Sequence, residues 1–341
     1  MKALCAALLV CVLPARAEEI RIEVARGLAH ARLDQHALEV RDGKLFVDGK
    51  SHAGALVAVA AHLDGRALPG KLEVFADGGG LVAVNTLDLE EYVAAVVASE
   101  VPGGWPDEAL RAQAVAARTF AVAQKIAQGP GARAHLGASV LDQVYKYAPS
   151  AAAQQAARAT AGQVLTWGAS PIAAWFSASC GGVSESAEAA FSTGAGSTPY
   201  IQGGSPDDDE GAPKREWTVH IPLAELTAAL KKADRVRGEV ESLRVVSRTA
   251  SGRAKTVRLE AGRAQASLSA VELRQLLGYT RLPSLLFEVA VEGGEAVFTG
   301  RGSGHGVGLC QWGARGRARR GQGYREILAH YYPGAEIRRM Y

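Results

Sequence analysis

Residues 88–128 constrain the fold of this chain most, because they contain two helical patterns joined by a short Pro/Gly/Trp break. Asp88 is a typical N-cap residue. The apolar residues after it recur at helical spacing: Leu89, Tyr92, Val93, Val96 and Val97. The same face next reaches Glu100, and Pro102 and two glycines follow directly. The sequence therefore predicts a helix whose last turn places a carboxylate on its buried face.

The position of Glu100 has a chemical consequence. An ionised carboxylate without a partner is costly to bury, so Glu100 is expected to stay protonated or to acquire a cation. A glutamic acid that is protonated near neutral pH can act as a general acid. The alternative is that Glu100 points into solvent or forms a salt bridge at the helix end, and periodicity alone favours that alternative.

The second helical pattern begins after Trp105, with Pro106 suited to its first turn. It is rich in alanine, which allows a neighbouring helix or sheet to approach closely. Its basic residues recur at heptad spacing: Arg111, Arg118 and Lys125. Such a row is usually a solvated face, but here it can also supply one arginine to pair with Glu100 or to hold an anionic substrate group.

Four blocks of sequence occur in a characteristic order. They are NTLDLEEYVAAVVASEVPGGWPDEALRAQAVAARTF at Asn85–Phe120, PIAAWFSASCGGVSES at Pro171–Ser186, GRGSGHGVGLCQWGA at Gly300–Ala314 and YREILAHYYPGAEI at Tyr324–Ile337. Together they resemble the SpoIID/LytB family, which comprises stage II sporulation protein D and amidase-enhancer relatives. The resemblance implies a lytic transglycosylase that acts on peptidoglycan glycan strands. It also implies that Glu100 is the catalytic acid and that Arg118 is an active-site arginine.

A set of residues in these blocks is also expected to bind the substrate: Gln113, Ser177, Ser179, His305 and Gln311. Serine hydroxyls suit sugar hydroxyl or acetamido groups, and paired glycines allow a backbone to approach a sugar closely. The alternatives are a β-bulge with a tight turn for the serine segment and a purely structural role for His305.

The first 17 residues, MKALCAALLVCVLPARA, have one early lysine, a short apolar run and an A-x-A cleavage site. They are typical of a secretory signal peptide, so we expect export to the periplasm or another extracytoplasmic space. The apolar run is too short for a membrane span, and no later stretch qualifies. Lipid attachment at Cys11 is the minor alternative, since Val10 is not the small residue that such sites prefer.

Cleavage after Ala17 leaves Cys180 and Cys310 as the remaining cysteines. An even pair in an exported protein predicts a disulfide, and the alternative is two free buried thiols. Cys180, His305 and Cys310 offer three soft ligands but no local C-x₂-C or H-x₃-H pair, so neither a metal site nor any other cofactor is expected. The formal net charge of +3, two units of which lie in the leader, gives no electrostatic footprint for nucleic acid.

The remaining pattern predicts an α+β protein. Residues 18–84 alternate short apolar runs with Asp-Gly and Gly-rich turns, which indicates an antiparallel β-rich N-terminal lobe. Residues 85–215 and 299–341 hold the family blocks and are expected to form a mixed α/β catalytic core. Within this core, a hairpin is expected after the alanine-rich segment 151–162. Residues 216–298 read as a small α+β insertion. The acidic run 207–210 and the basic run 315–320 are expected to be solvated.

The chain offers one well-placed carboxylate and no obvious second, whereas ordinary glycosidases need two. A lytic transglycosylase can use one, because a hydroxyl of the substrate acts as the nucleophile. The expected products therefore carry 1,6-anhydro-N-acetylmuramic acid ends, from strands that are stripped of peptide. One rival is a non-catalytic wall-binding or amidase-enhancing module with an amidase partner. A second is an inverting glycosidase that uses Asp142 or Glu188 as its base.

Overall fold

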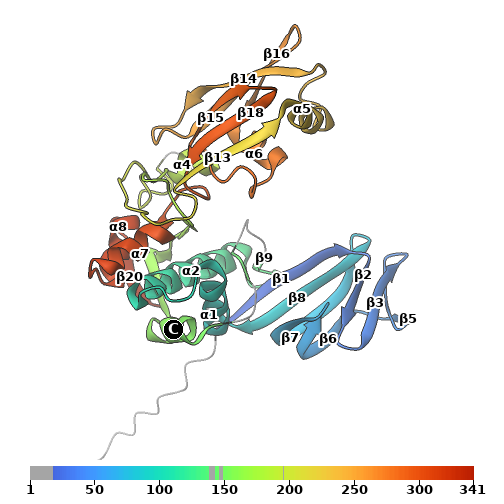
Figure 1. The fold of residues 1–341 in the computed structure, drawn as a ribbon. Coiled ribbons are helices and arrows are strands. Elements are labelled where there is room, and N and C mark those ends of the chain that lie inside the picture. Colours follow the sequence, from blue (N-terminus) through green and yellow to red (C-terminus); the bar gives the residue numbers. More distant parts are fainter. Residues whose placement is uncertain (1–17, 138–142, 146–148, 195) are drawn as a thin grey trace, which may run out of the picture.

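The computed structural model describes residues 18–137, 143–145, 149–194 and 196–341 (Figure 1). Its N-terminal part is a nine-stranded sheet of order β5-β4-β3-β2-β6-β7-β8-β1-β9. The strands are β1 (Glu19–Leu28), β2 (His30–Leu33), β3 (His36–Arg41), β4 (Lys44–Val47), β5 (Lys50–His52), β6 (Leu56–Leu63), β7 (Arg66–Asp77), β8 (Gly80–Asp88) and β9 (Leu136–Gly137). Neighbouring strands are antiparallel except β1 and β9, which run parallel.

Asp-Gly turns connect several of these strands. Asp42 and Gly43 have φ angles of 49° and 71°, and Asp64 and Gly65 have 49° and 78°. Two-residue hairpin turns whose twist matches the strands require positive φ at both positions, and Asp-Gly tolerates it. The β-rich N-terminal lobe is therefore present as the turn pattern predicts, and its last long strand, β8, leads directly into the first helix.

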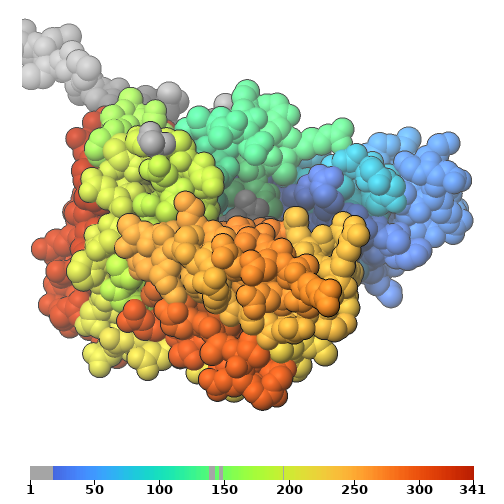
Figure 2. All heavy atoms as spheres, turned by 90° about the horizontal axis from the view of Figure 1, so that it is seen from above, coloured from blue at the N-terminus to red at the C-terminus, as the bar shows by residue number. Residues whose placement is uncertain are grey.

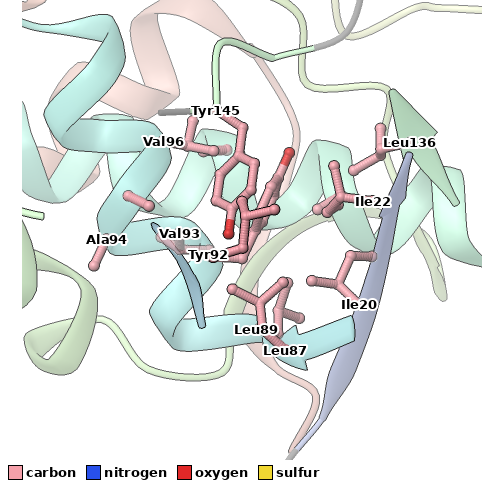
Figure 3. Close-up of a cluster of buried hydrophobic side chains, with 14 of the residues drawn as sticks. Ile20, Ile22, Leu87, Leu89, Tyr92, Val93, Ala94, Val96, Leu136 and Tyr145 are labelled. Atoms are coloured by element: carbon pink, nitrogen blue, oxygen red, sulfur yellow. The ribbon is translucent and has the colours of Figure 1, made fainter. Parts of the chain in front are cut away.

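The helical hairpin consists of α1 (Leu89–Glu100) and α2 (Asp107–Gln128). The Asp88 carboxylate caps α1 by accepting hydrogen bonds from the backbone N–H groups of Glu90 (2.8 Å) and Glu91 (3.1 Å). Figure 3 shows how the apolar face of α1 packs against β1 and against Leu136 and Tyr145. The hairpin is thus anchored to the N-terminal sheet by a continuous hydrophobic core.

The rest of the core combines short strands with helices. It contains α3 (Ala151–Ala159), α4 (Ala187–Phe191), α7 (Gln311–Arg319), α8 (Tyr324–Tyr331), a sheet of β11 (Ser170–Pro171), β10 (Gln163–Trp167) and β20 (Glu336–Arg339), and the parallel pair β12 (Phe176–Ser177) and β19 (Leu309–Cys310). The expected hairpin after α3 is only partly correct, because β12 leaves it to pair with β19. This pairing brings the second and third sequence blocks together.

The insertion holds two three-stranded sheets and two helices. They are β13 (Glu216–Pro222), α5 (Leu223–Lys232), β14 (Val240–Arg248), β15 (Ala254–Ala261), β16 (Ala264–Ser269), α6 (Ala270–Leu277), β17 (Phe287–Glu292) and β18 (Glu295–Arg301). It has its own hydrophobic core, drawn from residues 217–298. Figure 2 shows it in yellow and orange on the side of the molecule that faces the viewer. The chain is α+β, as expected, and none of its described helices has the length and apolar character to cross a membrane.

Candidate active site

Glu100 is the last residue of α1, where the extended backbone of Val101 (φ −120°, ψ 138°) ends the helix. Its Oε1 accepts a hydrogen bond from the backbone N–H of Val144 (2.8 Å), and its Oε2 accepts one from Nε2 of Gln311 (3.3 Å). Burial raises the pKa of Glu100 above that of an ordinary glutamate, although both hydrogen bonds favour the ionised form. Within the described parts of the chain it forms no ion pair. Glu100 is thus a partly accessible carboxyl group that resists ionisation.

Gln311 begins α7 and reaches Glu100 across 211 positions of the sequence. The residue before it, Cys310, pairs with Ser177 in the β12–β19 ladder and caps α7. The side chain of Gln311 is buried, so its amide is held in place rather than free to rotate. Two residues expected at the same site, Glu100 and Gln311, are therefore in contact.

Two tryptophans follow these residues along the chain. Trp105 lies in the break after α1 and Trp312 follows Gln311; their rings pack edge to face with centroids 5.2 Å apart. The Arg315 guanidinium lies 4.7 Å from the Trp312 ring centroid, and among the described residues it has no acidic partner. Aromatic faces and an unpaired guanidinium suit sugar rings and carboxylates. Sequence reasoning assigned neither tryptophan to the site, although each lies within five positions of a predicted site residue.

Arg118 does not pair with Glu100, and this corrects the contact that the basic row suggested. Its side chain is fully buried and donates from Nε (2.8 Å) and from a terminal nitrogen (2.5 Å) to the Glu90 carboxylate. Further hydrogen bonds join it to Thr160 and to the backbone oxygens of Ala157 and Gln163. Arg118 therefore joins α1, α2 and the segment after α3, and its contacts in this structure are those of a residue that stabilises the fold.

The two serines are also held inside the protein. Ser177 Oγ accepts a hydrogen bond from the backbone N–H of Gly306 (3.1 Å). Ser179 Oγ donates to Asp209 and accepts from the backbone N–H of Gly181 (3.3 Å). Both serines are buried, so their hydroxyls shape the backbone of the second and third blocks instead of facing a ligand in this conformation.

His305 is half-buried beside Phe191, with ring centroids 5.1 Å apart. Its Nδ1 accepts a hydrogen bond from the backbone N–H of Val307 (3.0 Å). Burial, and then the positive charges of Arg274 and Arg253, lower the pKa of His305 to about 3. The imidazole is therefore neutral at physiological pH and acts as a hydrogen-bonding group rather than as an acid.

Gln113 lies on α2 and is fully buried, and neither its Oε1 nor its Nε2 has a partner among the described residues. An unsatisfied buried amide is costly, so such a group commonly marks a place where a ligand or water completes its hydrogen bonds. The structure does not bring Gln113 into hydrogen-bond contact with Glu100 or Gln311. Its substrate-binding role stays a prediction.

The predicted disulfide is wrong, because Cys180 and Cys310 are both free. They are nevertheless neighbours: the backbone N–H of Cys180 donates to the Cys310 sulfur at 3.3 Å. Burial, and then the neighbouring Cys180 thiol, raise the pKa of Cys310 well above its usual range. The pairing of β12 with β19 already joins the two blocks, so the fold holds them together without a covalent bond.

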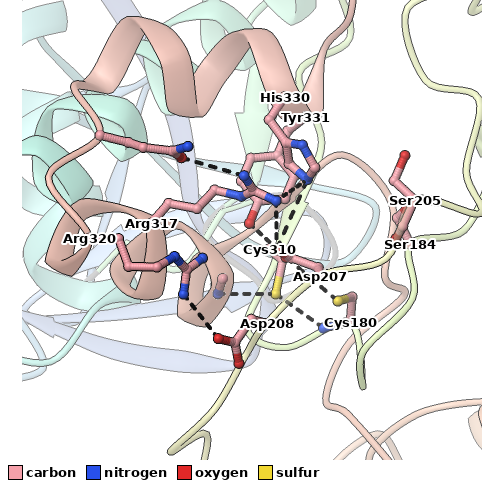
Figure 4. Close-up of polar contacts among 12 residues, drawn as sticks. Cys180, Ser184, Ser205, Asp207, Asp208, Cys310, Arg317, Arg320, His330 and Tyr331 are labelled. Atoms are coloured by element: carbon pink, nitrogen blue, oxygen red, sulfur yellow. Dashed lines mark hydrogen bonds and ion pairs between the residues drawn. The ribbon is translucent and has the colours of Figure 1, made fainter.

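The acidic run 207–210 and the basic run 315–320 also differ from expectation. Asp207 and Asp209 are buried, and Arg317 contacts Asp207 at 3.4 Å instead of facing only solvent (Figure 4). Of the two alternative glycosidase bases, Glu188 is exposed in the first turn of α4, and Asp142 lies outside the described residues. No carboxylate among the described residues forms a hydrogen bond with Glu100, whose two oxygens bond to Val144 and Gln311.

Two family profiles match parts of this chain. The profile of the stage II sporulation protein family (SpoIID) matches residues 77–167, which span α1, α2 and α3. A second profile, of a domain of unknown function (DUF8618), matches residues 205–308 and covers the insertion. The first profile therefore covers the helical hairpin, and the second covers the inserted sheets.

Several curated relatives match most of the chain. An uncharacterised protein of Brachyspira hyodysenteriae is 33% identical over 75% of this chain and 68% of its own. Stage II sporulation protein D of Bacillus amyloliquefaciens is 33% identical over 75% of each chain. The amidase enhancer of Bacillus subtilis is 28% identical over 71% of this chain, but only 39% of its own length is covered. These similarities show that the chain belongs to the stage II sporulation protein D (SpoIID) family.

Proposed function

We propose that this protein is an exported peptidoglycan lytic transglycosylase. It cleaves the β-1,4 bond between N-acetylmuramic acid and N-acetylglucosamine in peptide-stripped glycan strands. The observation that carries the proposal is Glu100: a partly accessible carboxyl at a helix end, with its pKa raised by burial and its two oxygens oriented by Val144 and Gln311. These are the properties of a general acid rather than of a structural salt bridge.

In the first step Glu100 protonates the glycosidic oxygen as the bond to the anomeric carbon of N-acetylmuramic acid breaks. The substrate acetamido group shields the developing positive charge. The ionised Glu100 then takes the proton from the C6 hydroxyl of the same sugar, whose oxygen bonds to the anomeric carbon and closes the 1,6-anhydro ring. The second step is intramolecular, which gives a large entropic advantage over attack by water.

The neighbouring residues support this cycle in different ways. Gln311 donates to Glu100 and so stabilises the carboxylate that forms between the two steps. Trp312 offers a ring face, and Arg315 a cation, for the sugar and for the lactyl carboxylate of N-acetylmuramic acid. His305 and Gln113 remain candidates for sugar binding. Arg118 holds α1 against α2 through Glu90 and thereby supports the helix that carries Glu100.

The alternative is a non-catalytic module that binds the wall or activates an amidase. The observation that favours it is the similarity to a protein named amidase enhancer. The same site residues would then hold glycan without cutting it, and an amidase would be the partner. Under either proposal the protein acts outside the cytoplasm, where the signal-peptide-like residues 1–17 would direct it.

Incubation of the purified protein with denuded glycan strands separates these functions. The transglycosylase releases fragments with 1,6-anhydro ends, which mass spectrometry identifies by the loss of one water relative to a hydrolysed fragment. Reducing ends would instead show hydrolysis, and binding without new ends would support the amidase-enhancing module. The reaction is followed with a parallel sample of intact wall material to establish whether attached peptides block cleavage.

A further inference from the structure

The segment 143–145 supplies one of the two hydrogen bonds that orient Glu100. The backbone N–H of Val144 donates to Oε1 of Glu100 (2.8 Å), yet the segment belongs to no helix or strand. An amide in an irregular segment keeps a fixed direction only where the side chains around it hold the backbone in place. The contacts of Gln143 and Tyr145, on either side of Val144, therefore decide where this amide points.

Gln143 binds the segment to the helical hairpin. Its Oε1 accepts a hydrogen bond from the Tyr92 hydroxyl (2.8 Å), and its Nε2 donates to the backbone oxygen of Ala117 (3.1 Å). Tyr92 lies on α1 and Ala117 on α2, and the side chain of Gln143 is buried. The residue before Val144 is thus held by the helix that ends in Glu100 and by the helix packed against it.

Tyr145 binds the segment to the N-terminal sheet. Its hydroxyl donates to Oδ1 of Asn85 in β8 (2.9 Å), and its ring centroid lies 5.4 Å from that of Tyr92. Asn85 is fully buried, and its Nδ2 donates to the backbone oxygens of Pro69 (2.6 Å) and Lys71 (3.2 Å). Figure 3 shows the two tyrosines together between α1 and β1. The side chain of Tyr145 therefore has a fixed place.

Arg66 holds the backbone of the same residue. It is the first residue of β7, directly after the Asp64-Gly65 turn, and its guanidinium donates to the backbone oxygen of Tyr145. The guanidinium carbon also lies 5.3 Å from the centroid of the Tyr145 ring. Burial lowers the pKa of Arg66, and no carboxylate among the described residues counters this effect. The cation of Arg66 is thus directed at a carbonyl group and a ring instead of an ion pair.

We propose that Arg66 is a positioning residue for Glu100. Through the carbonyl of Tyr145 it fixes the segment 143–145, and so keeps the Val144 amide within hydrogen-bond distance of the Glu100 carboxyl group. An amide that donates to a carboxylate favours the ionised form. Arg66 therefore influences how readily Glu100 gives up its proton. The importance of this effect for catalysis rests on the proposed function, whereas the effect on the carboxyl group does not.

Arg66 has no direct influence on Glu100. The pKa of Glu100 responds to burial, to the Val144 amide and to Gln311, and no charged group of the described structure shifts it. Any effect of Arg66 must therefore pass through the segment 143–145. Arg66 also lies outside residues 77–167 and 205–308, which the two family profiles match. The N-terminal sheet thus contributes to the candidate site a residue that neither profile covers.

A titration of the Glu100 carboxyl group tests this role without an enzymatic assay. In protein with glutamate isotope-labelled at the side-chain carboxyl, the Glu100 resonance is the one that is absent from E100Q. Its chemical shift as a function of pH gives the pKa directly. Arg66→Met removes the donor and should raise the pKa of Glu100 by about one unit, which is typical for the loss of one hydrogen bond to a carboxylate. Tyr145→Phe removes the bond to Asn85 without changing a charge at neutral pH, and should cause a smaller rise.

The matched control is Arg41→Met. Arg41 also stacks on an aromatic ring of the N-terminal sheet, at 5.2 Å from the centroid of Phe46, and its loss removes the same charge. The pKa of Glu100 should not change in R41M. Circular dichroism establishes that each variant is folded, and Y145F decides the question if R66M does not fold.

Two results would overturn the positioning role. One is an unchanged Glu100 pKa in folded R66M, or in Y145F where R66M does not fold. The other is a shift in R41M as large as that in R66M. The outcome for the proposed function is separate, because it depends on glycan cleavage. If R66M shifts the pKa but the wild type releases no anhydro ends, the positioning role stands and the proposed function fails.

Discussion

The Nε2 of Gln311 lies 3.3 Å from the Oε2 of Glu100, and the two residues belong to helices that are far apart in the sequence. Burial favours the protonated form of Glu100, and Gln311 partly opposes it. The balance between these two effects sets the pH range in which Glu100 can serve as both acid and base.

Gln311→Leu removes this opposing hydrogen bond and should raise the pKa of Glu100 further. The alkaline limb of the pH–activity profile should then move to higher pH, because the acid stays protonated longer. The rate at the optimum should fall roughly 10–100-fold, since the carboxylate formed in the cycle loses a donor. Gln202→Leu, at an exposed glutamine, should leave the profile unchanged. A lower rate without any shift of the limb would contradict this role for Gln311.

Glu100→Gln should stabilise the fold at neutral pH. Since the folded-state pKa is raised, the wild type is most stable below the ordinary glutamate pKa and loses stability as pH rises through the raised value. The variant cannot ionise, so its advantage should be about 1.4 kcal/mol for each unit by which the pKa is raised. Thermal melts at about pH 4 and pH 8 measure the difference. The exposed Glu91→Gln is the control, and equal melts of E100Q and wild type at both pH values would refute the buried-acid assignment.

Glu90→Gln should destabilise the protein strongly, because it leaves the guanidinium of Arg118 buried without its carboxylate. The expected loss is about 3 kcal/mol, or roughly 5–10 °C in melting temperature. Burial opposes ionisation of Glu90, but Arg118, Tyr341 and Gly162 outweigh it and lower the pKa. The stability that the Arg118–Glu90 ion pair contributes is therefore present above the ordinary glutamate pKa, and it is lost as pH falls through the lowered pKa of Glu90.

The control for this pair is Glu288→Gln, which breaks an exposed contact with Arg248 and should cost less than about 1 kcal/mol. If E90Q and E288Q lowered the melting temperature equally, the Arg118–Glu90 pair would stabilise the fold no more than an exposed ion pair does. Residual activity per folded molecule should survive in E90Q, since Arg118 is held away from the reacting atoms.

Arg315→Ala should weaken binding of strands that carry lactyl carboxylates. We expect KM to rise roughly 5–20-fold, which is typical for the loss of one charge-assisted contact, with a smaller effect on kcat. Chitin-like strands without lactyl groups should bind the wild type and the variant alike. Arg319→Ala, exposed on the same helix, is the control. An equal loss on both kinds of strand would show that Arg315 does not recognise the carboxylate.

Local pattern was sufficient for the parts of the fold that depend on neighbours in sequence. Asp88, the apolar face of α1 and the Asp-Gly turns each have a local physical cause, and the structure contains them as predicted. Helical spacing also places Glu100 on the apolar face of α1, although periodicity alone favours an exposed or ion-paired side chain over the partly buried one that the structure shows. These features need no knowledge of distant residues.

The partner of Arg118 required the geometry of the hairpin. Glu90 lies ten residues before the end of α1, and Arg118 lies eleven after the start of α2. At 1.5 Å per residue, both are therefore about 15–17 Å from the break, whereas Glu100 is next to it. The heptad spacing of the basic residues therefore does not show which carboxylate pairs with Arg118. That pairing becomes evident only when the two helices are placed side by side.

Two further misses have long-range causes. β12 and β19 have two residues each, too few to show a pattern, yet their pairing buries Ser177 and brings Cys180 to Cys310. The aspartates of the run 207–210 look solvated by composition, but Gly313 leaves α7 without a side chain that would collide with Asp207. Whether Asp207 is buried therefore depends on α7, a helix about a hundred residues later in the sequence.

The most direct test compares the products of the wild type and Glu100→Gln on denuded glycan strands by mass spectrometry. The account predicts abundant 1,6-anhydro-N-acetylmuramic acid ends from the wild type. It predicts at least a roughly thousandfold lower rate from the variant, with an unchanged circular dichroism spectrum. Anhydro ends released by E100Q at the wild-type rate would contradict the central role of Glu100.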